Sequence, residues 1–83
     1  MEKNFRIFFR HGNNAKDMAI IQAESLDDAL TRFCESCINN DFTGIFFELE
    51  NADVEYYMDD SRFHKVTVNG IEYGTLIDKY EEV

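Results

Sequence analysis

Apolar and polar side chains alternate at the start of the chain. In residues 5–10 every odd-numbered side chain is apolar, whereas two of the even-numbered ones are arginines, and a two-residue period is typical of a β-strand with one buried face. Gly12-Asn13-Asn14 offers residues that tolerate positive φ, and residues 18–23 can return as an antiparallel partner. The pattern predicts a first β-hairpin.

Apolar side chains then recur every three or four residues between positions 26 and 38, which predicts an amphipathic helix. Ser25 occupies an N-cap position, and Asp27 and Asp28 place negative charge in the first turn, where the helix dipole favours it. Asp28 can also close a capping-box-like arrangement, and the asparagines at 39–40 are suitable terminators. We expect the helix to begin at Leu26 and to face a sheet with its apolar stripe, which comprises Leu26, Ala29, Leu30, Phe33, Cys34, Cys37 and Ile38.

Alternation returns in residues 45–50 and predicts a third strand, whose inward side chains would be Ile45, Phe47 and Leu49. Residues 54–58 alternate again and indicate a fourth strand. We expect a turn between these two strands, because small and polar residues separate them.

The hairpin at residues 66–73 has the clearest local signal. Asn69-Gly70 lies between alternating β-branched and aromatic residues and favours a type I′ turn. A two-residue loop sets the register and places four apolar side chains on one face. The predicted pairs are Val68 with Ile71, Val66 with Tyr73 and, on the other face, Thr67 with Glu72. Residues 76–83 either extend the last strand or form a short turn.

This order of elements predicts an α+β fold, ββαββββ, with one amphipathic helix packed on a largely antiparallel sheet of about five to six strands. The length of 83 residues and a hydrophobic content of 45% suit a single compact domain, residues 1–83. One helix covers one sheet face, so the other face must be solvated, closed by curling or buried against a partner. Four aromatic side chains out of phase with the inward positions would point to that uncovered face: Phe8, Phe46, Tyr57 and Phe63.

Negative charge is concentrated in the middle of the chain, and the formal net charge is −9. Between Arg32 and Arg62 there is no lysine or arginine, but there are eight carboxylates: Glu35, Asp41, Glu48, Glu50, Asp53, Glu55, Asp59 and Asp60. Charge of this sign opposes binding to nucleic acid and to anionic membranes, and it favours binding to cationic surfaces. The simplest alternative is that the acidity only keeps the protein soluble.

An acidic row is the candidate binding site. Residues two apart on a strand share a face at a spacing of about 6.6–6.8 Å, so Glu48 and Glu50 would form a row that imitates a phosphate backbone. Steering by charge needs apolar anchors to gain affinity. The predicted partner-binding residues are the acidic Glu48, Glu50, Asp53, Glu55, Asp59 and Asp60, with Phe46 and Tyr57 as anchors.

Other chemistry has weaker support in the sequence. Cys34 and Cys37 match a C-x-x-C pattern, which with His11 or His64 could indicate a redox or metal site. Both cysteines fall on the apolar stripe in the second half of the helix, where the dipole disfavours a thiolate, so we predict two small buried side chains instead. The carboxylates do not follow the EF-hand pattern and no catalytic motif occurs. We expect no enzyme activity, no metal and no cofactor.

The expected location is the cytoplasm. No apolar run reaches the roughly 20 residues that span a bilayer, and residues 1–4 lack the hydrophobic stretch of a signal peptide. The two cysteines also fit a reducing compartment better than a disulfide-bonded secreted domain.

In size, acidity and single-helix layout, the chain resembles the small phage-encoded proteins that disarm bacterial defence, namely anti-CRISPR and anti-restriction inhibitors. The resemblance rests on the whole chain, on the acidic stretch 33–61 and on the junction Ala23-Glu24-Ser25-Leu26-Asp27-Asp28-Ala29-Leu30. It carries over no functional residue. It implies an inhibitor that binds the basic surface of a nucleic-acid-handling effector in the cytoplasm of a host cell, for example a CRISPR or restriction complex.

The leading hypothesis is therefore a non-enzymatic acidic binding protein that acts as a nucleic-acid mimic. The alternative is a homo-oligomeric structural or accessory domain, such as a homodimer, whose open sheet face packs against its own copy.

Overall fold

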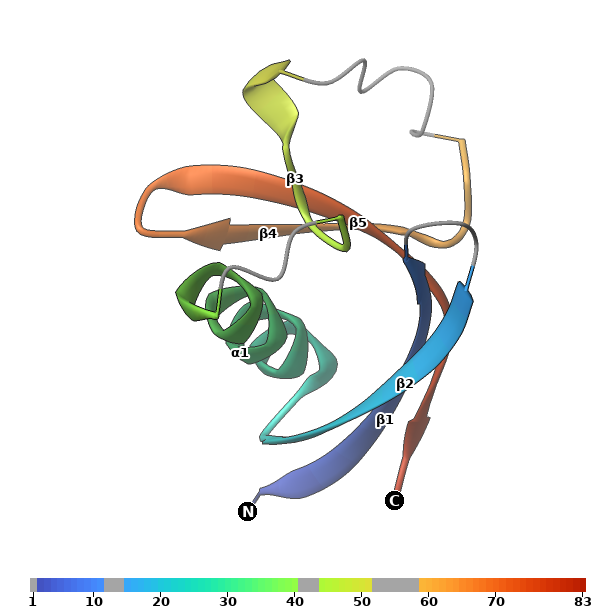
Figure 1. Cartoon of the computed structure of the whole chain (residues 1–83). Helices are drawn as coiled ribbons and strands as arrows, with labels where there is room; N and C mark the ends of the chain where they lie inside the picture. The colour runs from blue at the N-terminus through green and yellow to red at the C-terminus, as the bar shows by residue number, and fades with distance from the viewer. Residues whose placement is uncertain (1, 12–14, 41–43, 52–58) are drawn as a thin grey trace.

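The protein is an α+β structure in which one helix packs on a curled antiparallel sheet (Figure 1). The computed structural model describes residues 2–11, 15–40, 44–51 and 59–83. The described elements are β1 (Lys3–His11), β2 (Ala15–Ala23), α1 (Leu26–Asn39), β3 (Phe47–Glu48), the short 3-10 helix η1 (Leu49–Asn51), β4 (Phe63–Val68) and β5 (Ile71–Glu82).

Strand β5 connects the two halves of the sheet. The order is β2-β1-β5-β3, and β4 pairs with β5 outside this path. Gly74 pairs with Phe47 of β3 and with Lys65 of β4, so these two strands lie along opposite edges of β5. Further along the strand, Ile77 pairs with Phe9 of β1. The tail left open by the sequence is therefore a continuation of β5.

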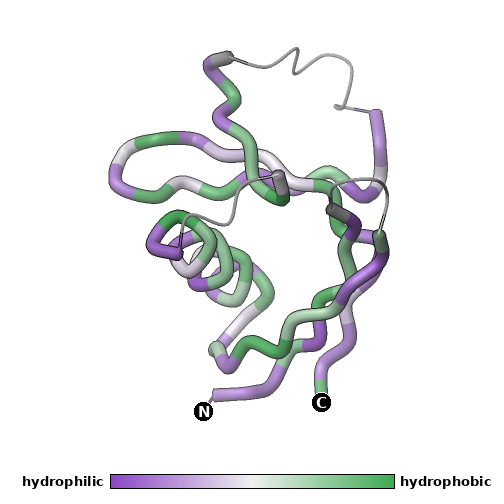
Figure 2. Tube along the Cα trace, viewed as in Figure 1, coloured by the Kyte–Doolittle hydropathy of each residue, from purple (hydrophilic) through white to green (hydrophobic). Residues whose placement is uncertain are grey.

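Helix α1 lies in the concavity of the sheet, between β1–β2 and the β4–β5 hairpin (Figure 1). We call this concave side the inner face and the opposite side the outer face. Along the strands, hydrophobic residues alternate with hydrophilic ones, as one buried face requires (Figure 2). The core residues form one cluster: Phe5, Ile7, Phe9, Ala23, Ala29, Leu30, Phe33, Cys34, Cys37, Ile45, Val66, Val68 and Ile77.

The predicted first hairpin is confirmed, and both of its strands are longer than predicted. Phe5, Ile7 and Phe9 are buried on the inner face, as the alternation indicated. Phe5 pairs with Ile21 and Ile7 pairs with Ala19. Local alternation was sufficient here because a sheet with one buried face tolerates no slip of one residue.

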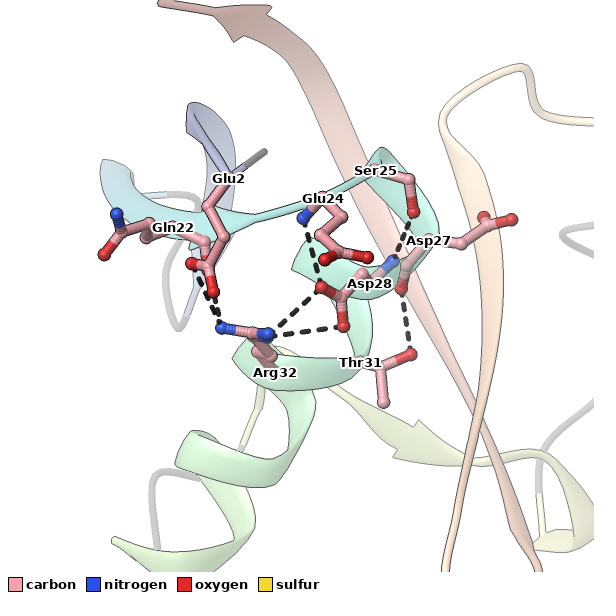
Figure 3. Close-up of polar contacts among 8 residues, drawn as sticks. All are labelled: Glu2, Gln22, Glu24, Ser25, Asp27, Asp28, Thr31 and Arg32. Carbon is pink, nitrogen blue, oxygen red and sulfur yellow. Dashed lines mark hydrogen bonds and ion pairs between the residues drawn. The ribbon is translucent and has the colours of Figure 1, made fainter.

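The helix begins at Leu26, as predicted, with Ser25 as its N-cap (Figure 3). The backbone N–H of Asp28 donates to Ser25 Oγ at 3.1 Å, and the Asp28 carboxylate accepts the N–H of Glu24 at 3.1 Å. This is the expected reciprocal cap. In a standard capping box the side chain would accept the N–H of the N-cap residue, Ser25, whereas here it accepts the N–H of the preceding residue, Glu24. One residue of the predicted stripe is wrong, because Ile38 in the last turn is 41% exposed and lies outside the core.

The second hairpin has the predicted register. Asn69 and Gly70 have φ values of 53° and 80°, which are the positive values of a type I′ turn. Val66 and Val68 are buried on the inner face. The four apolar side chains share one face, as predicted, because Ile71 pairs with Val68 and Tyr73 pairs with Val66. Ile71 is nevertheless 44% exposed, since it directly follows the turn and lies outside the core cluster.

The predicted third strand is largely wrong. Only Phe47–Glu48 is a strand, and the chain continues into η1. Ile45 is buried as expected, but Phe46 also packs inward and makes an edge-on contact with Phe33 at 5.3 Å between ring centroids. Phe46 is therefore not on the uncovered face. The alternation breaks because residues 44–46 form a bend that begins at Gly44, whose φ is 103°.

The packing of side chains on the outer face next to β3 requires a glycine at position 74. Phe47 stacks on Phe63 with ring centroids 6.3 Å apart, and Leu49 lies beside them. A Cβ at Gly74 would lie 2.8 Å from Leu49 Cδ2, 2.8 Å from Phe63 Cε1 and 3.1 Å from Phe47 Cε2. Phe47 and Leu49 thus occupy the outer face, opposite to the side predicted for them.

The predicted fourth strand, residues 54–58, lies outside the described residues. Among the described residues, no helix has the length and apolar character needed to cross a membrane.

Replacement of Gly74 by alanine should lower the free energy of unfolding by about 1–3 kcal/mol, because the new Cβ overpacks the contact between β3 and β4. Urea denaturation measures this change. The same substitution in a Leu49→Ala chain should cost less, because one of the clashing groups is gone. A Gly74→Ala protein as stable as the wild type would contradict this packing.

Replacement of Ser25 by alanine should lower the free energy of unfolding by about 1 kcal/mol, because the N–H of Asp28 loses its acceptor. Ser61→Ala is the control, since Ser61 is exposed in a turn, and it should change stability by less than about 0.5 kcal/mol. Equal effects of the two substitutions in thermal unfolding would argue against the cap.

Candidate acidic binding surface

Basic side chains gather on the outer face, where carboxylates pair with them. Arg10 Nε lies 3.0 Å from Asp78 Oδ2, and Arg62 contacts both Asp78 at 3.5 Å and Asp60 at 2.7 Å. Asp78 can serve two arginines because the pairing of β1 with β5 shifts at this point, so that Asp78 is an extra residue in β5.

The same network continues along β5. Glu81 lies 3.8 Å from Arg6 and 3.4 Å from Lys79, and the Lys79 ammonium lies over the ring of Phe8 at 4.6 Å from its centroid. Phe8 is on the outer face, as predicted, and half-buried. Paired charges therefore cover the part of the outer face that β1 and β5 form.

Asp60 belongs to this network and has Arg62 as its partner. Two side-chain hydrogen bonds and one backbone hydrogen bond from Arg62 lower the pKa of the Asp60 carboxyl to about 2, and the guanidinium charge acts in the same direction. The bonds to Asp60 in turn raise the pKa of Arg62. Asp60, a predicted site residue, is thus paired with an internal cation.

Several other carboxylates are exposed and form no ion pair with any described residue. These are Glu24, Asp27, Glu35, Glu50, Asp59 and Glu72. Asp27 and Glu35 lie on the helix, Glu50 in η1 and Glu72 in β5, whereas Glu24 and Asp59 lie outside these elements. These carboxylates are thus not neutralised by the outer-face network.

Two of these carboxylates lie around one hollow that includes the turn end of the β4–β5 hairpin. The hollow has a volume of about 480 Å³ and is lined by Leu49, Glu50, Lys65, Gly70, Ile71 and Glu72. We call it the acidic hollow. Glu50 and Glu72 are exposed, Lys65 forms no ion pair with a described residue, and the half-buried Leu49 and the exposed Ile71 add apolar surface. The hollow thus combines negative charge with an apolar wall.

Glu48 lies near the acidic hollow but in a different orientation. It pairs with Tyr73, whose side chain packs on the inner side, whereas Glu50 lies in η1 and lines the acidic hollow. The predicted strand row of Glu48 and Glu50 is wrong because the strand ends at Glu48. Burial, and then the charge of Glu48, raise the pKa of the Tyr73 phenol.

The structure adds Glu72 to the predicted acidic residues. Asp53, Glu55 and Tyr57 lie outside the described residues, and Asp59 is exposed in a turn. The sequence pattern predicts only that Glu72 pairs with Thr67 across the hairpin, on the face that the structure shows to be the outer one. Glu72 and Glu50 line the same hollow because Glu50 lies in η1, which local alternation does not predict.

Cys34 and Cys37 are both buried in the core, as predicted. Burial raises the pKa of the Cys34 thiol to about 11, with further increases from Cys37 and Glu35, and burial also raises that of Cys37. No group of three or more His, Cys, Asp or Glu side chains in the described ranges is arranged to hold a metal ion. Of the suggested histidines, His64 is half-buried in β4.

No protein-family model matches the chain, and comparisons with curated proteins and with solved structures also give no match.

Both thiols should resist a disulfide reagent such as Ellman's reagent in the folded protein and react rapidly in denaturant, because a buried, protonated thiol is a poor nucleophile. Since the pKa of Cys34 rises from 9.0 to about 11 on folding, its contribution to stability is complete below pH 9 and is lost as the pH rises towards about 11. A rapid reaction of either thiol in the folded state would contradict this.

Proposed function

We propose that the protein is a non-enzymatic binding protein that docks on the basic, nucleic-acid-binding surface of another protein and inhibits it. It would act as a nucleic-acid mimic, as an anti-CRISPR or other anti-defence inhibitor of a phage does. The observation that carries the proposal is the acidic hollow, in which two exposed carboxylates flank apolar surface on a chain with a net charge of −9.

The charge distribution supports a directed surface. Arg6, Arg10, Arg62 and Lys79 have carboxylate partners on the outer face of β1 and β5, so they do not screen Glu50 and Glu72 by direct contact. Lys65 also lines the hollow, so its charged lining is two carboxylates and one ammonium, and the remaining negative field favours the approach of a cationic partner and orients it.

The shape of the hollow suits a long basic side chain. A lysine or arginine of the partner would lay its aliphatic stem along Leu49 and Ile71 and place its charge between Glu50 and Glu72. Ile71, at 44% exposure, takes the role of apolar anchor that the sequence had suggested for Phe46. Glu48, Asp53, Glu55, Asp59 and Tyr57 remain part of the proposed surface.

Reversing the charge of the hollow tests the proposal. The protein is used to capture partners from a bacterial lysate at low and high salt, and captured proteins are identified by mass spectrometry. We expect a basic nucleic-acid-handling protein that is released by salt and displaced by DNA. The double variant Glu50→Lys/Glu72→Lys should bind it at least about tenfold more weakly, which corresponds to about 1.4 kcal/mol.

The matched control is Asp27→Lys/Glu35→Lys, which makes the same change of charge on exposed positions of the helix. It should weaken binding much less, because it leaves the hollow intact. Equal loss in the two double variants would mean that only total charge matters, and capture of no basic protein would contradict the proposal.

A further inference from the structure

Strand β2 is an edge strand with apolar side chains on its outer face. Among the described residues it pairs only with β1. Ile20 is 63% exposed and Met18 is 40% exposed. A long edge with exposed apolar side chains and no proline is a template for another strand.

Two side-chain contacts show which backbone groups point away from β1. The Arg32 guanidinium donates to the C=O of Gln22 at 3.1 Å (Figure 3), and the N–H of Met18 donates to Asp17 Oδ1 at 2.8 Å. In an antiparallel ladder, alternate residues direct N–H and C=O to the same neighbour. Met18, Ile20 and Gln22 therefore all direct their backbone groups to the open edge.

The edge is thus blocked at two points and open between them. Asp17 occupies the N–H of Met18, and Arg32 occupies the C=O of Gln22. The open groups, which have no hydrogen bond to any described residue, are the C=O of Met18, both groups of Ile20 and the N–H of Gln22. This is a short window centred on Ile20.

We propose that this window binds a second copy of the chain, with the two β2 strands antiparallel about a twofold axis at Ile20. Ile20 then exchanges both hydrogen bonds with Ile20 of the second copy. The N–H of Gln22 donates to the C=O of Met18 in the other copy, and the reverse bond also forms. These four bonds use every open group of the window, while each blocked N–H of Met18 faces a blocked C=O of Gln22.

The side chains agree with this pairing. The two Ile20 side chains become neighbours on the outer face, Met18 lies across from Gln22, and Lys16 lies across from Glu24 of the second copy. Residues 15–23 contain one lysine and one aspartate, so this edge is neutral in a chain of charge −9. Two copies can therefore approach along β2 with less repulsion than elsewhere.

This inference does not depend on the proposed function. Strands β2 and β3 lie at opposite ends of the sheet order, so the dimer leaves the acidic hollow of each copy exposed. The interface is small, and the dimer should therefore be reversible and concentration-dependent. A foreign strand is the other occupant that could fit the window, and the test below separates the two.

A cysteine at the twofold axis tests the geometry. Cα atoms of a hydrogen-bonded antiparallel pair lie about 5.5 Å apart, which is within the range of roughly 4.4–6.8 Å that disulfides span. Ile20→Cys should give a covalent dimer on mild oxidation, and the buried Cys34 and Cys37 should not compete. Val83→Cys is the control, because Val83 is 62% exposed, almost as much as Ile20, but directly follows β5 and does not belong to β2.

Sedimentation provides the second measurement. The wild type should shift from monomer to dimer as its concentration rises to the millimolar range, Ile20→Lys should remain monomeric, and Val83→Lys should behave as the wild type. A wild type that stays monomeric leaves the window to a foreign strand and overturns the proposal. A dimer that survives Ile20→Lys, or equal cross-linking of the two cysteine variants, overturns it as well.

Discussion

The rest of the structure depends on one constraint, which is that a single helix can cover only one face of the sheet. The sheet curls around α1, so that one apolar cluster fills the concavity. On the convex side the described residues supply no helix, and Arg10, Arg62 and Asp78 form part of a layer of paired charges instead. Isolated surface pairs contribute only about 0–1 kcal/mol each, but shared partners in a network fix the geometry of the long strand that carries them.

That layer of ion pairs determines which carboxylates remain without a nearby cation. Apart from Lys16 and Lys65, every lysine and arginine has an ion pair among the described residues, whereas carboxylates such as Glu50 and Glu72 have none there. The unpaired negative charge of the described residues therefore lies outside the ion pairs formed between β1 and β5. The same need to manage an open sheet explains the edge of β2, where side chains block some backbone groups and leave others accessible.

The sequence predicts those features of the fold that depend on residues close together in the chain. The register about Asn69-Gly70 follows from a two-residue turn, and the start of the helix follows from the cap at Ser25. The short third strand could not be predicted, because Phe47 turns outward into the space left by Gly74, far along the chain. The partners of Asp78 were hidden for the same reason, since Arg10 is 68 residues away. Thus the helix and hairpins were predictable, but the acidic hollow was not.

The most direct test of this account is a map of the electrostatic potential at the protein surface. Paramagnetic co-solutes of opposite charge, one cationic and one anionic, enhance the nuclear relaxation of nearby amides according to the local potential. We expect a more negative potential around Glu50 and Glu72 than around Phe8 and Arg10 of β1. A potential that is equally negative at both places would contradict the claim that the charges are segregated.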